Sequence, residues 1–338
     1  MSCLYHPVQI GSLRLEGNLF LAPIAGYSDR AFRSLCAEQG ASFCTTEMVS
    51  AEALVRGSGK TAALMEKSPA EKAYAVQIFG GNADVMAQAV PIVLTRTSCD
   101  ALDINGGCPV PKIVKSGAGS MLTREPERLY AIVSAVKGAV KAFAAAHPER
   151  PEIPVTIKIR SGWDAQHITW KEAAEAALSA GADAITIHAR TRAQGYEGKA
   201  DWGIQRQLVE FVAGRIPVFG SGDANSPESA RRMLEETGVD GVMFARGAMG
   251  DPFLFRRVRQ YLQEGHYDEE PLKDRLLAGF RELELNVADK GEQTACVQMR
   301  KKFCAYSSGI RGGAKLRAQV VSASSVQDYR AIFNSYLV

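Results

Sequence analysis

The order of the apolar segments constrains the fold of this chain more than any other feature. Short apolar or β-branched runs, which predict strands, occur at residues 18–23, 43–48, 74–79, 101–105, 155–160, 184–188, 217–220 and 241–245. Helical segments separate them, at residues 29–38, 83–94, 125–146, 170–180, 204–212, 227–237 and 251–262. Thr123, Thr169 and Ser226 are the expected caps of three of these helices. Eight strand–helix units whose strands are apolar on both faces predict an α/β fold, a closed parallel (β/α)8 TIM barrel.

The main alternative is an open, doubly wound sheet, which would need a Gly-x-Gly-x-x-Gly loop after its first strand. The first strand here ends in Pro23-Ile24-Ala25-Gly26, which cannot form that loop. After residue 262 the strand pattern stops, and residues 272–290, 294–307 and 314–323 have helical character. We therefore expect two domains, a barrel at residues 1–264 and a small all-helical domain at residues 265–338.

The composition is that of an ordinary globular protein, with 46% hydrophobic and 23% charged residues. The seven cysteines form no C-x-x-C pair, which argues against disulfides and zinc and favours a reducing, cytoplasmic location. No cluster of His, Cys or carboxylate residues has the spacing of metal ligands, so no metal is expected. The sequence also shows no signal peptide and no membrane span, and we expect a monomer.

The charge is unevenly distributed along the chain. From residue 296 to the end there are seven Lys and Arg residues and one acid, a net charge of +6, although the whole chain carries only +3. Within this segment, Arg300, Lys301 and Lys302 form a continuous basic run. Such a tail favours a polyanionic partner. A solvated helix face is the alternative that charge alone leaves open.

Polar residues gather where the expected strands end, which is where (β/α)8 barrels carry their active sites. The most distinctive segment is Asn105-Gly106-Gly107-Cys108-Pro109, in which glycines and a proline surround an ionisable thiol. The residue types alone leave the role of Cys108 open between packing, ligation, redox chemistry and catalysis. Gln77 and Lys158 lie within apolar strands, where an unpartnered polar group is costly.

Lys158 and His188 each have a simpler reading. Lys158 would form an internal ion pair with Glu47 or Asp103, and His188 would be a hydrogen-bonded core histidine.

The loops after the seventh and eighth strands indicate a particular kind of ligand more specifically than these single residues do. Ser221-Gly222-Asp223 and Ala245-Arg246-Gly247 lie where such barrels commonly bind phosphate. Glycine-rich backbone and an arginine predict a phosphorylated cofactor or substrate there.

Taken together, these segments resemble the tRNA-dihydrouridine synthase family. The matching motifs occur in order at residues 21–33, 103–112, 115–120, 158–162, 188–192, 221–223 and 245–247, and the tail matches more loosely through Arg300-Lys301 and Tyr306. Two positions depart from the usual pattern: Ser221 replaces an asparagine, and Ala245 precedes the arginine in place of a glycine. Both changes keep the backbone donors and the arginine.

The resemblance implies an enzyme that holds FMN non-covalently, takes electrons from NADPH and reduces the C5=C6 bond of particular uridines in tRNA. It implies contacts to the flavin from Pro23, Ile24, Ala25, Gln77, Lys158 and His188, and contacts to its phosphate end from Ser221, Gly222, Asp223, Ala245 and Arg246. Asn105 and Arg190 would meet the uracil, and Arg300, Lys301 and Lys302 would bind the RNA.

Reduction of uracil needs a hydride at C6, from flavin N5, and a proton at C5. A thiol with an ordinary pKa of about 8.5 is protonated at pH 7, whereas a carboxylic acid of about 4 is not. Cys108 is therefore the expected proton donor, with a pKa that is not strongly lowered. The rival hypotheses are another FMN-dependent pyrimidine oxidoreductase acting on a free base, and an idle RNA-binding barrel. The sequence leaves open which uridine is modified and whether NADPH or NADH is preferred.

Overall fold

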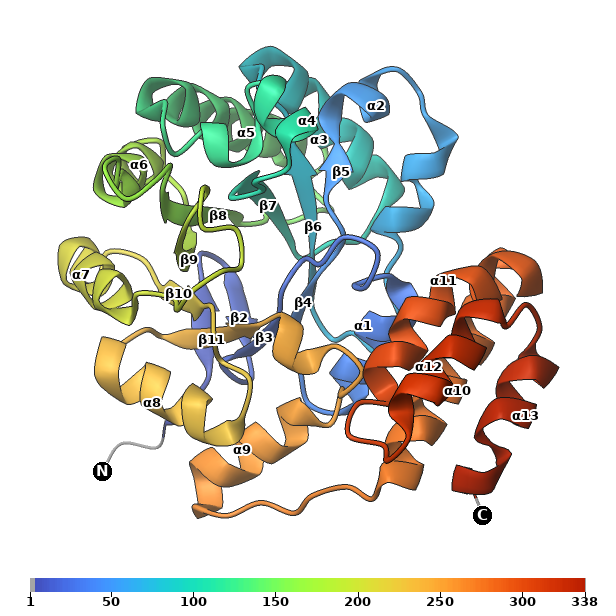
Figure 1. Cartoon of the computed structure of the whole chain (residues 1–338). Coiled ribbons are helices and arrows are strands. Elements are labelled where there is room, and N and C mark those ends of the chain that lie inside the picture. The colour runs from blue at the N-terminus through green and yellow to red at the C-terminus, as the bar shows by residue number, and fades with distance from the viewer. Residues whose placement is uncertain (1–3, 338) are drawn as a thin grey trace.

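A computed structural model describes residues 4–337 and shows a closed parallel barrel beside a group of helices (Figure 1). The eight barrel strands are β3 (Leu19–Leu21), β4 (Phe43–Thr45), β6 (Tyr74–Phe79), β7 (Ala101–Gly106), β8 (Val155–Gly162), β9 (Ala184–Thr191), β10 (Val218–Ser221) and β11 (Gly241–Phe244). Each pairs with its neighbours in parallel, and pairing of β4 with β6 closes the ring. The short β5 (Val49–Ser50) continues along β6. The expected (β/α)8 fold is confirmed.

Helices surround the barrel in the order that the sequence predicts. They are α1 (Arg30–Glu38), α2 (Ala51–Val55), α3 (Ala83–Arg96), α4 (Pro111–Lys115), α5 (Pro126–Ala146), α6 (Trp170–Ser179), α7 (Trp202–Val212), α8 (Pro227–Thr237) and α9 (Leu254–Glu264). Four short 3-10 turns, Gly59–Thr61, Ala63–Met65, Gly119–Met121 and Arg246–Ala248, lie in the loops. The sequence reading missed α2 and α4, which are only five residues long.

The helix caps were predicted with mixed success. Ser226 caps α8 in a reciprocal capping box with Ser229, as expected. Thr123 does not cap α5, because its hydroxyl donates to the Ser120 carbonyl and Glu125 takes the N-cap position. Thr169 stands at the N-cap of α6, but its side chain forms no cap hydrogen bond.

The helix α5 is long and apolar enough to cross a membrane by length and composition, with a mean hydropathy of 1.4. In the fold it is an outer helix of the barrel, packed between α3 and α6 and against β8. Its buried side chains, Leu129, Ile132, Val133, Val136, Val140 and Phe143, face this core. Its apolar face is thus explained by packing within the protein.

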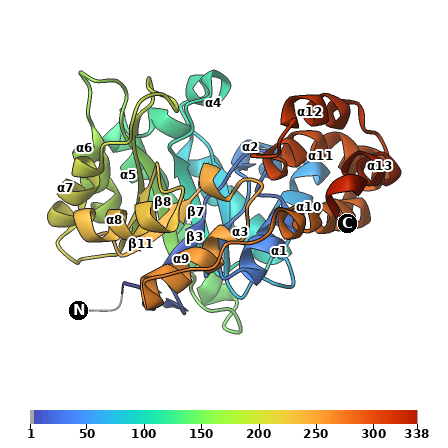
Figure 2. The same ribbon diagram turned by 60° about the horizontal axis from the view of Figure 1, so that its bottom comes forward.

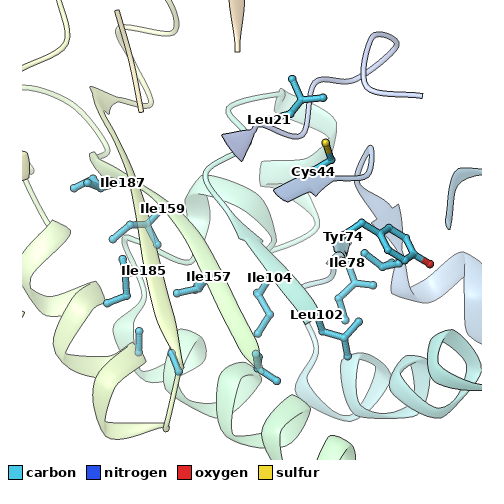
Figure 3. Close-up of a cluster of buried hydrophobic side chains, with 14 of the residues drawn as sticks. Leu21, Cys44, Tyr74, Ile78, Leu102, Ile104, Ile157, Ile159, Ile185 and Ile187 are labelled. Carbon is cyan, nitrogen blue, oxygen red and sulfur yellow. The ribbon is translucent and has the colours of Figure 1, made fainter. Parts of the chain in front are cut away.

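The alternation of side chains along each strand separates the core from the site. Figure 3 shows the outward-facing set, which includes Leu102, Ile104, Ile157 and Ile185 and packs under the surrounding helices. The intervening residues of the same strands point into the barrel. Their lower layer is apolar and, with the antiparallel hairpin of β1 (Val8–Ile10) and β2 (Leu13–Leu15), forms a second buried cluster. Their upper layer is polar and forms the site.

The last four helices are α10 (Leu272–Lys290), α11 (Glu292–Tyr306), α12 (Gly313–Ser322) and α13 (Val326–Leu337). They share a hydrophobic cluster of their own, separate from those of the barrel, and α10 packs on α1. The sequence reading missed α13, which completes this cluster with Tyr329 and Phe333. Figure 2 shows these helices standing beside the barrel. A domain boundary at 264/265 stays a prediction.

Candidate active site

A cavity of about 410 Å³ opens where the barrel strands end. Its lining brings together every residue expected to hold the cofactor, namely Pro23, Ile24, Ala25, Gln77, Lys158, His188, Ser221, Gly222, Asp223, Ala245 and Arg246. Asn105 and Cys108 line the same cavity. Residues that lie up to about 220 positions apart in the sequence therefore share one wall because the barrel closes. Arg190, Arg300, Lys301 and Lys302 are not part of this lining.

The floor of the cavity is a hydrogen-bonded chain across three neighbouring strands. The amide of Asn105 donates to Gln77 at 2.8 Å, and that of Gln77 donates to Asp103 at 2.6 Å. Asp103 also accepts from the hydroxyl of Thr156 at 2.5 Å. Burial raises the pKa of Asp103, while the hydrogen bonds from Thr156 and Gln77 oppose that shift. The chain fixes both amide orientations from below, so the floor is preorganised.

The loop that carries the thiol is held by the same asparagine. The Asn105 side-chain oxygen accepts from the backbone N–H of Cys108 at 3.0 Å and of Gly107 at 3.3 Å. Behind the loop, Gly119 has a positive φ of 63°, and a Cβ there would lie 2.6 Å from the carbonyl oxygen of Cys108. Burial raises the pKa of the Cys108 thiol, with Arg160 and Lys158 opposing the rise. The thiol is therefore protonated at neutral pH.

Lys158 faces the cavity without a partner of its own. Neither of the ion pairs considered from the sequence forms, and no hydrogen bond or salt bridge of its ammonium occurs within residues 4–337. Glu47 instead accepts from the backbone N–H of Gly26. Burial, and then the charge of Arg160, lower the pKa of Lys158 to about 8. The cavity thus holds a half-buried cation that an anionic ligand edge would stabilise.

His188 is neutral in this site. Burial, followed by the charges of Lys158, Arg160, Arg190 and Arg246, lowers the pKa of His188 to about 2. Its ring also sets the shape of the next loop, because a Cβ on Gly222 would lie 2.8 Å from its Cδ2 atom. A neutral imidazole among cations offers a hydrogen bond without adding charge.

The loops after β10 and β11, where the sequence predicts an anion cradle, meet at the wall of the cavity. Gly222 has φ of 107° and Asp223 has φ of 60°, a left-handed conformation that is costly for a residue with a side chain. Arg246 donates to Asp223 at 3.2 Å and remains half-exposed beside the cavity. Within the described residues, no acceptor pairs with the backbone N–H groups of Gly222, Ala224 or Gly247. Free N–H groups next to an arginine suit a phosphate.

Arg190 is buried beside Asp223, outside the lining of the cavity in which a substrate would bind. It is only 1% exposed, and its guanidinium donates to Asp223 at 2.8 and 2.9 Å. It also donates to the carbonyls of Glu197 and Gly198. With its donors already used, Arg190 holds the strained Asp223 in place and does not face the cavity. The expected contact between Arg190 and uracil is therefore corrected to a supporting role.

The three basic residues of the tail separate into three environments. Lys302 is 2% exposed and bonds to Asp29, at 2.8 Å, and to Glu282. Its position is an internal ion pair between α11 and the start of α1, so an RNA phosphate has no access to it and its expected RNA contact is corrected. Arg300 is half-buried and donates to the carbonyl of Ala323 at 2.9 Å. Lys301 alone is exposed, with its ammonium 4.8 Å from the ring centroid of Tyr27.

Tyr196 is the most informative of the cavity-wall residues that the sequence did not reveal, and Arg160, two residues after Lys158 in β8, lines the same cavity. Tyr196 is 61% exposed and lines the cavity. The centroid of its ring lies 5.8 Å from the Cζ atom of Arg160 and 5.3 Å from that of Arg246. Arg160 also ties Gly107 to the end of β9 through three backbone carbonyls. Tyr196 follows β9 in a polar loop that has no motif, so only the folded chain shows that it lines the cavity.

Among the described residues, no group of three or more His, Cys, Asp or Glu could hold a metal ion.

The fold and this cavity define the class, a (β/α)8-barrel enzyme with a cationic cavity beside a protonated thiol. A family model described as dihydrouridine synthase matches residues 20–335. A "Probable tRNA-dihydrouridine synthase" of Treponema pallidum is 53% identical over 97% of this chain and 96% of its own length. A "tRNA-dihydrouridine synthase B" of Pseudomonas putida is 38% identical over 97% of this chain and 94% of its own length. The chain belongs to the dihydrouridine synthase family.

Solved structures that resemble this chain support the barrel fold. The histamine dehydrogenase of Rhizobium sp. 4-9 matches with a TM-score of 0.56 and 14% identity, over 84% of this chain and 51% of that one. A DHODH of Eimeria tenella, solved in complex with ferulenol, matches with a TM-score of 0.55 and 15% identity, over 76% and 83%.

Proposed function

We propose that this chain is a tRNA-dihydrouridine synthase, which reduces the C5=C6 bond of uridine in tRNA. One observation carries the proposal beyond the family match. A protonated thiol lies in a loop at the wall of one cavity, whose other walls are a half-buried lysine without a partner among the described residues and the glycine-containing loops beside Arg246. That combination suits reduction of a neutral base, in which developing negative charge must be met by a proton.

The residues of the cavity fit flavin mononucleotide. Gly222, Ala224 and Gly247 offer free backbone N–H groups, and Arg246 offers a charge, for the phosphate end. A side chain at Gly222 would fill this cradle, as its 2.8 Å approach to His188 shows. Lys158 and Gln77 would meet the polar edge of the ring. When bound and reduced by NADPH, the flavin would supply the hydride.

The remaining steps belong to this chain's own residues. Asn105 holds the thiol loop through the backbone of Cys108, and the Cys108 thiol gives its proton to C5 of the uracil. His188 is not a proton donor at neutral pH, because its pKa lies at about 2. Gly106 and Gly107, which follow Asn105, let the thiol loop pass close to β8, because a Cβ on Gly106 would lie 3.2 Å from the Lys158 carbonyl oxygen. The target base must leave its stack to reach the cavity, at a cost of about a few kcal/mol.

The exposed cations of the last helices provide the RNA-facing surface in this proposal. Lys301, Arg311, Lys315 and Arg317 are exposed, and no ion pair of these four occurs within residues 4–337. A tRNA bound there would extend over the cavity mouth beside them. The proposal includes a monomeric enzyme acting in the cytoplasm.

The decisive experiment compares Cys108→Ala with wild type on unmodified tRNA. We expect the variant to bind FMN and oxidise NADPH at the normal rate, and to lose about 10²- to 10⁴-fold in uridine reduction, the usual contribution of a general acid. Cys304→Ala, at another partly exposed cysteine, is the matched control and should be fully active. Full activity of Cys108→Ala on tRNA would remove the proton-donor role.

A second assay separates this function from the reduction of a free pyrimidine. The wild-type enzyme should form dihydrouridine in a tRNA transcript and leave free uracil and orotate unchanged. Turnover of the free bases with none on tRNA would contradict the proposal and indicate a small-molecule pyrimidine oxidoreductase.

A further inference from the structure

Two arginines converge on one half-buried indole at the barrel rim, outside the cavity lining. The guanidinium of Arg192 lies 4.7 Å from the ring centroid of Trp163, and that of Arg124 lies 5.1 Å from it. The three residues come from different segments, after β9, after β8 and before α5. We call Arg124, Trp163 and Arg192 the rim triad.

The rim triad is held rigidly by an extension of the barrel ladder. The backbone N–H of Arg192 donates to Gly162 at 2.8 Å, and that of Ala193 donates to Trp163 at 2.8 Å. The N–H of Trp163 donates to the carbonyl of His167 at 2.9 Å, which closes the loop behind it. A Cβ on Gly162 would lie 2.2 Å from that carbonyl oxygen, so only glycine permits this turn. The backbone that carries Trp163 and Arg192 is therefore held in place by hydrogen bonds within the protein.

The charges of the rim triad are not neutralised by the protein. No salt bridge of Arg124 or Arg192 occurs within the described part of the chain. The neighbouring carboxylates are occupied elsewhere, Glu125 by Arg128 at 3.0 Å and Asp164 by His167 at 2.7 Å. The guanidinium groups of Arg124 and Arg192, both close to the Trp163 ring, lie no farther apart than the screening length of about 10 Å at 0.1 M salt. Their charges therefore repel each other.

One atom of the rim triad is also unsatisfied. The Nε of Arg192 is buried and has no hydrogen-bond partner among the residues that the structure describes. A buried, unpaired donor on a charged group is costly, and native structures usually provide a partner for it. Uncompensated charge and an orphan donor at the same guanidinium both point to an anion that binds there.

We propose that the rim triad is a phosphate site on the barrel itself, in which Arg192 and Arg124 bind the phosphate and Trp163 packs against the attached nucleoside. Planar guanidinium groups match the geometry of phosphate, and indole rings stack on nucleobases. The inference rests on the proposed function for its main ligand, the backbone of tRNA. The 2′-phosphate of NADPH carries the same chemistry and is the other source.

The position of the rim triad favours the RNA. Arg160, which lines the cavity, bonds to the carbonyls of Thr191 and Gly195 in the same loop. Figure 2 shows the yellow-green loops that follow β8 and β9 rising on one side of the barrel mouth, and α11 and α12 rising on the other. A polyanion lying across the mouth would thus meet cations on both sides of the target base.

The test uses Arg192→Met and the more exposed Arg124→Met in the full-length holoenzyme. We expect each variant to bind an unmodified tRNA transcript about tenfold more weakly, the loss of one charged hydrogen bond. The slope of log Kd against log salt should fall by about one phosphate contact. Arg128→Met is the matched control, because Arg128 lies nearby at the start of α5 but is paired with Glu125; its tRNA affinity should not change.

A parallel measurement identifies the source of the phosphate. Flavin reduction by NADPH and by NADH is followed without tRNA in the same variants. Weaker tRNA binding with an unchanged NADPH KM assigns the site to RNA, and a raised KM for NADPH but not NADH assigns it to the dinucleotide. If tRNA affinity, salt slope and NADPH KM all match those of wild type in both variants, the phosphate site is wrong. Binding is measured apart from turnover, so the two proposals can fail separately. If the enzyme did not reduce uridine, the proposed function would be wrong, but the measured tRNA affinities would still test the phosphate site.

Discussion

At the scale of single residues, the site depends on groups whose protonation differs from that in water. Lys158 shows this most clearly, because burial lowers its pKa to about 8 and leaves it partly neutral in mildly basic solution. The neighbouring His188 stays neutral, and the Cys108 thiol stays protonated, for the same reason of burial. The cavity therefore has one cation whose charge depends on pH in the range in which proteins are handled.

The first prediction concerns this lysine. A cation with a lowered pKa loses its charge as the pH rises through that value, so affinity for an anionic ligand is greatest below pH 8 and declines above it. If only the ammonium form binds FMN, the Kd should increase about tenfold between pH 7 and pH 9. Fluorescence titration of the apoprotein with FMN measures this directly.

The control for that titration removes the charge altogether. Lys158→Met should bind FMN more weakly at pH 7 and show a nearly flat Kd from pH 7 to pH 9. Lys137→Met, which removes a lysine paired with Asp183, should keep the wild-type profile. An equally steep profile in Lys158→Met would assign the pH dependence to another group.

At the scale of elements, the strand order and the strand-end residues could be predicted from sequence because both rest on local patterns. Gln77 and Lys158 stood out as polar residues within apolar strands, the glycine-containing loops after β10 and β11 stood out by composition, and all of them line the cavity. The caps and short helices were less predictable, since Thr123 competes for the Ser120 carbonyl and α2 and α4 are too short to show a period.

The sequence could not predict whether a polar side chain faces the cavity or becomes buried between two elements that pack together. Arg190 and Lys302 have the composition of ligand contacts, yet both are buried in ion pairs with Asp223 and Asp29. Their partners lie 33 and 273 residues away along the chain. Only closure of the barrel and docking of α11 bring these charges together.

The prediction at this scale tests the cradle loop after β10. Gly222→Ala should weaken FMN binding strongly, because the new Cβ would lie 2.8 Å from His188 and the φ of 107° is unsuited to alanine. Gly214→Ala is the matched control, since it also has a positive φ of 73° but nothing within 4 Å of the new Cβ. It should cost some stability in urea unfolding and leave the Kd for FMN unchanged. Equal losses of FMN affinity in the two variants would mean that backbone strain alone matters.

At the scale of the whole molecule, a buried charge cluster joins the last helices to the barrel. Lys302 contacts Asp29, which caps α1, and Glu282 of α10, while Tyr306 donates to Glu282 at 2.7 Å. Lys290 adds a second cation on Asp29 at 2.9 Å. The cluster thus links α10 and α11 to the start of α1, at the side of the barrel.

The last prediction separates the two neighbouring lysines of α11. Lys302→Met leaves Glu282 without its cation in a buried position and should lower the free energy of unfolding by about 3–5 kcal/mol in a denaturant titration. Lys301→Met removes an exposed charge and should leave stability within about 0.5 kcal/mol of wild type while weakening tRNA binding. Unchanged stability in Lys302→Met would mean that the helices are held by apolar packing alone.

The two longest barrel strands, β8 and β9, extend beyond the floor of the cavity and carry loops at the barrel rim. β8 and β9 are eight residues each, whereas β10 and β11 are four. Thr156, in the first half of β8, bonds to Asp103 in the floor of the cavity. The far ends of both long strands stand clear of that floor and carry the loops with Trp163 and Tyr196. The two loops differ in how they reach the cavity, because the Tyr196 loop lines it and accepts from Arg160 and Arg190, whereas Trp163 lies outside its lining. A change at Trp163 should therefore alter contacts at the barrel rim while leaving the cavity and its reaction intact, which makes that loop the place to begin when the proposed RNA contacts are to be changed.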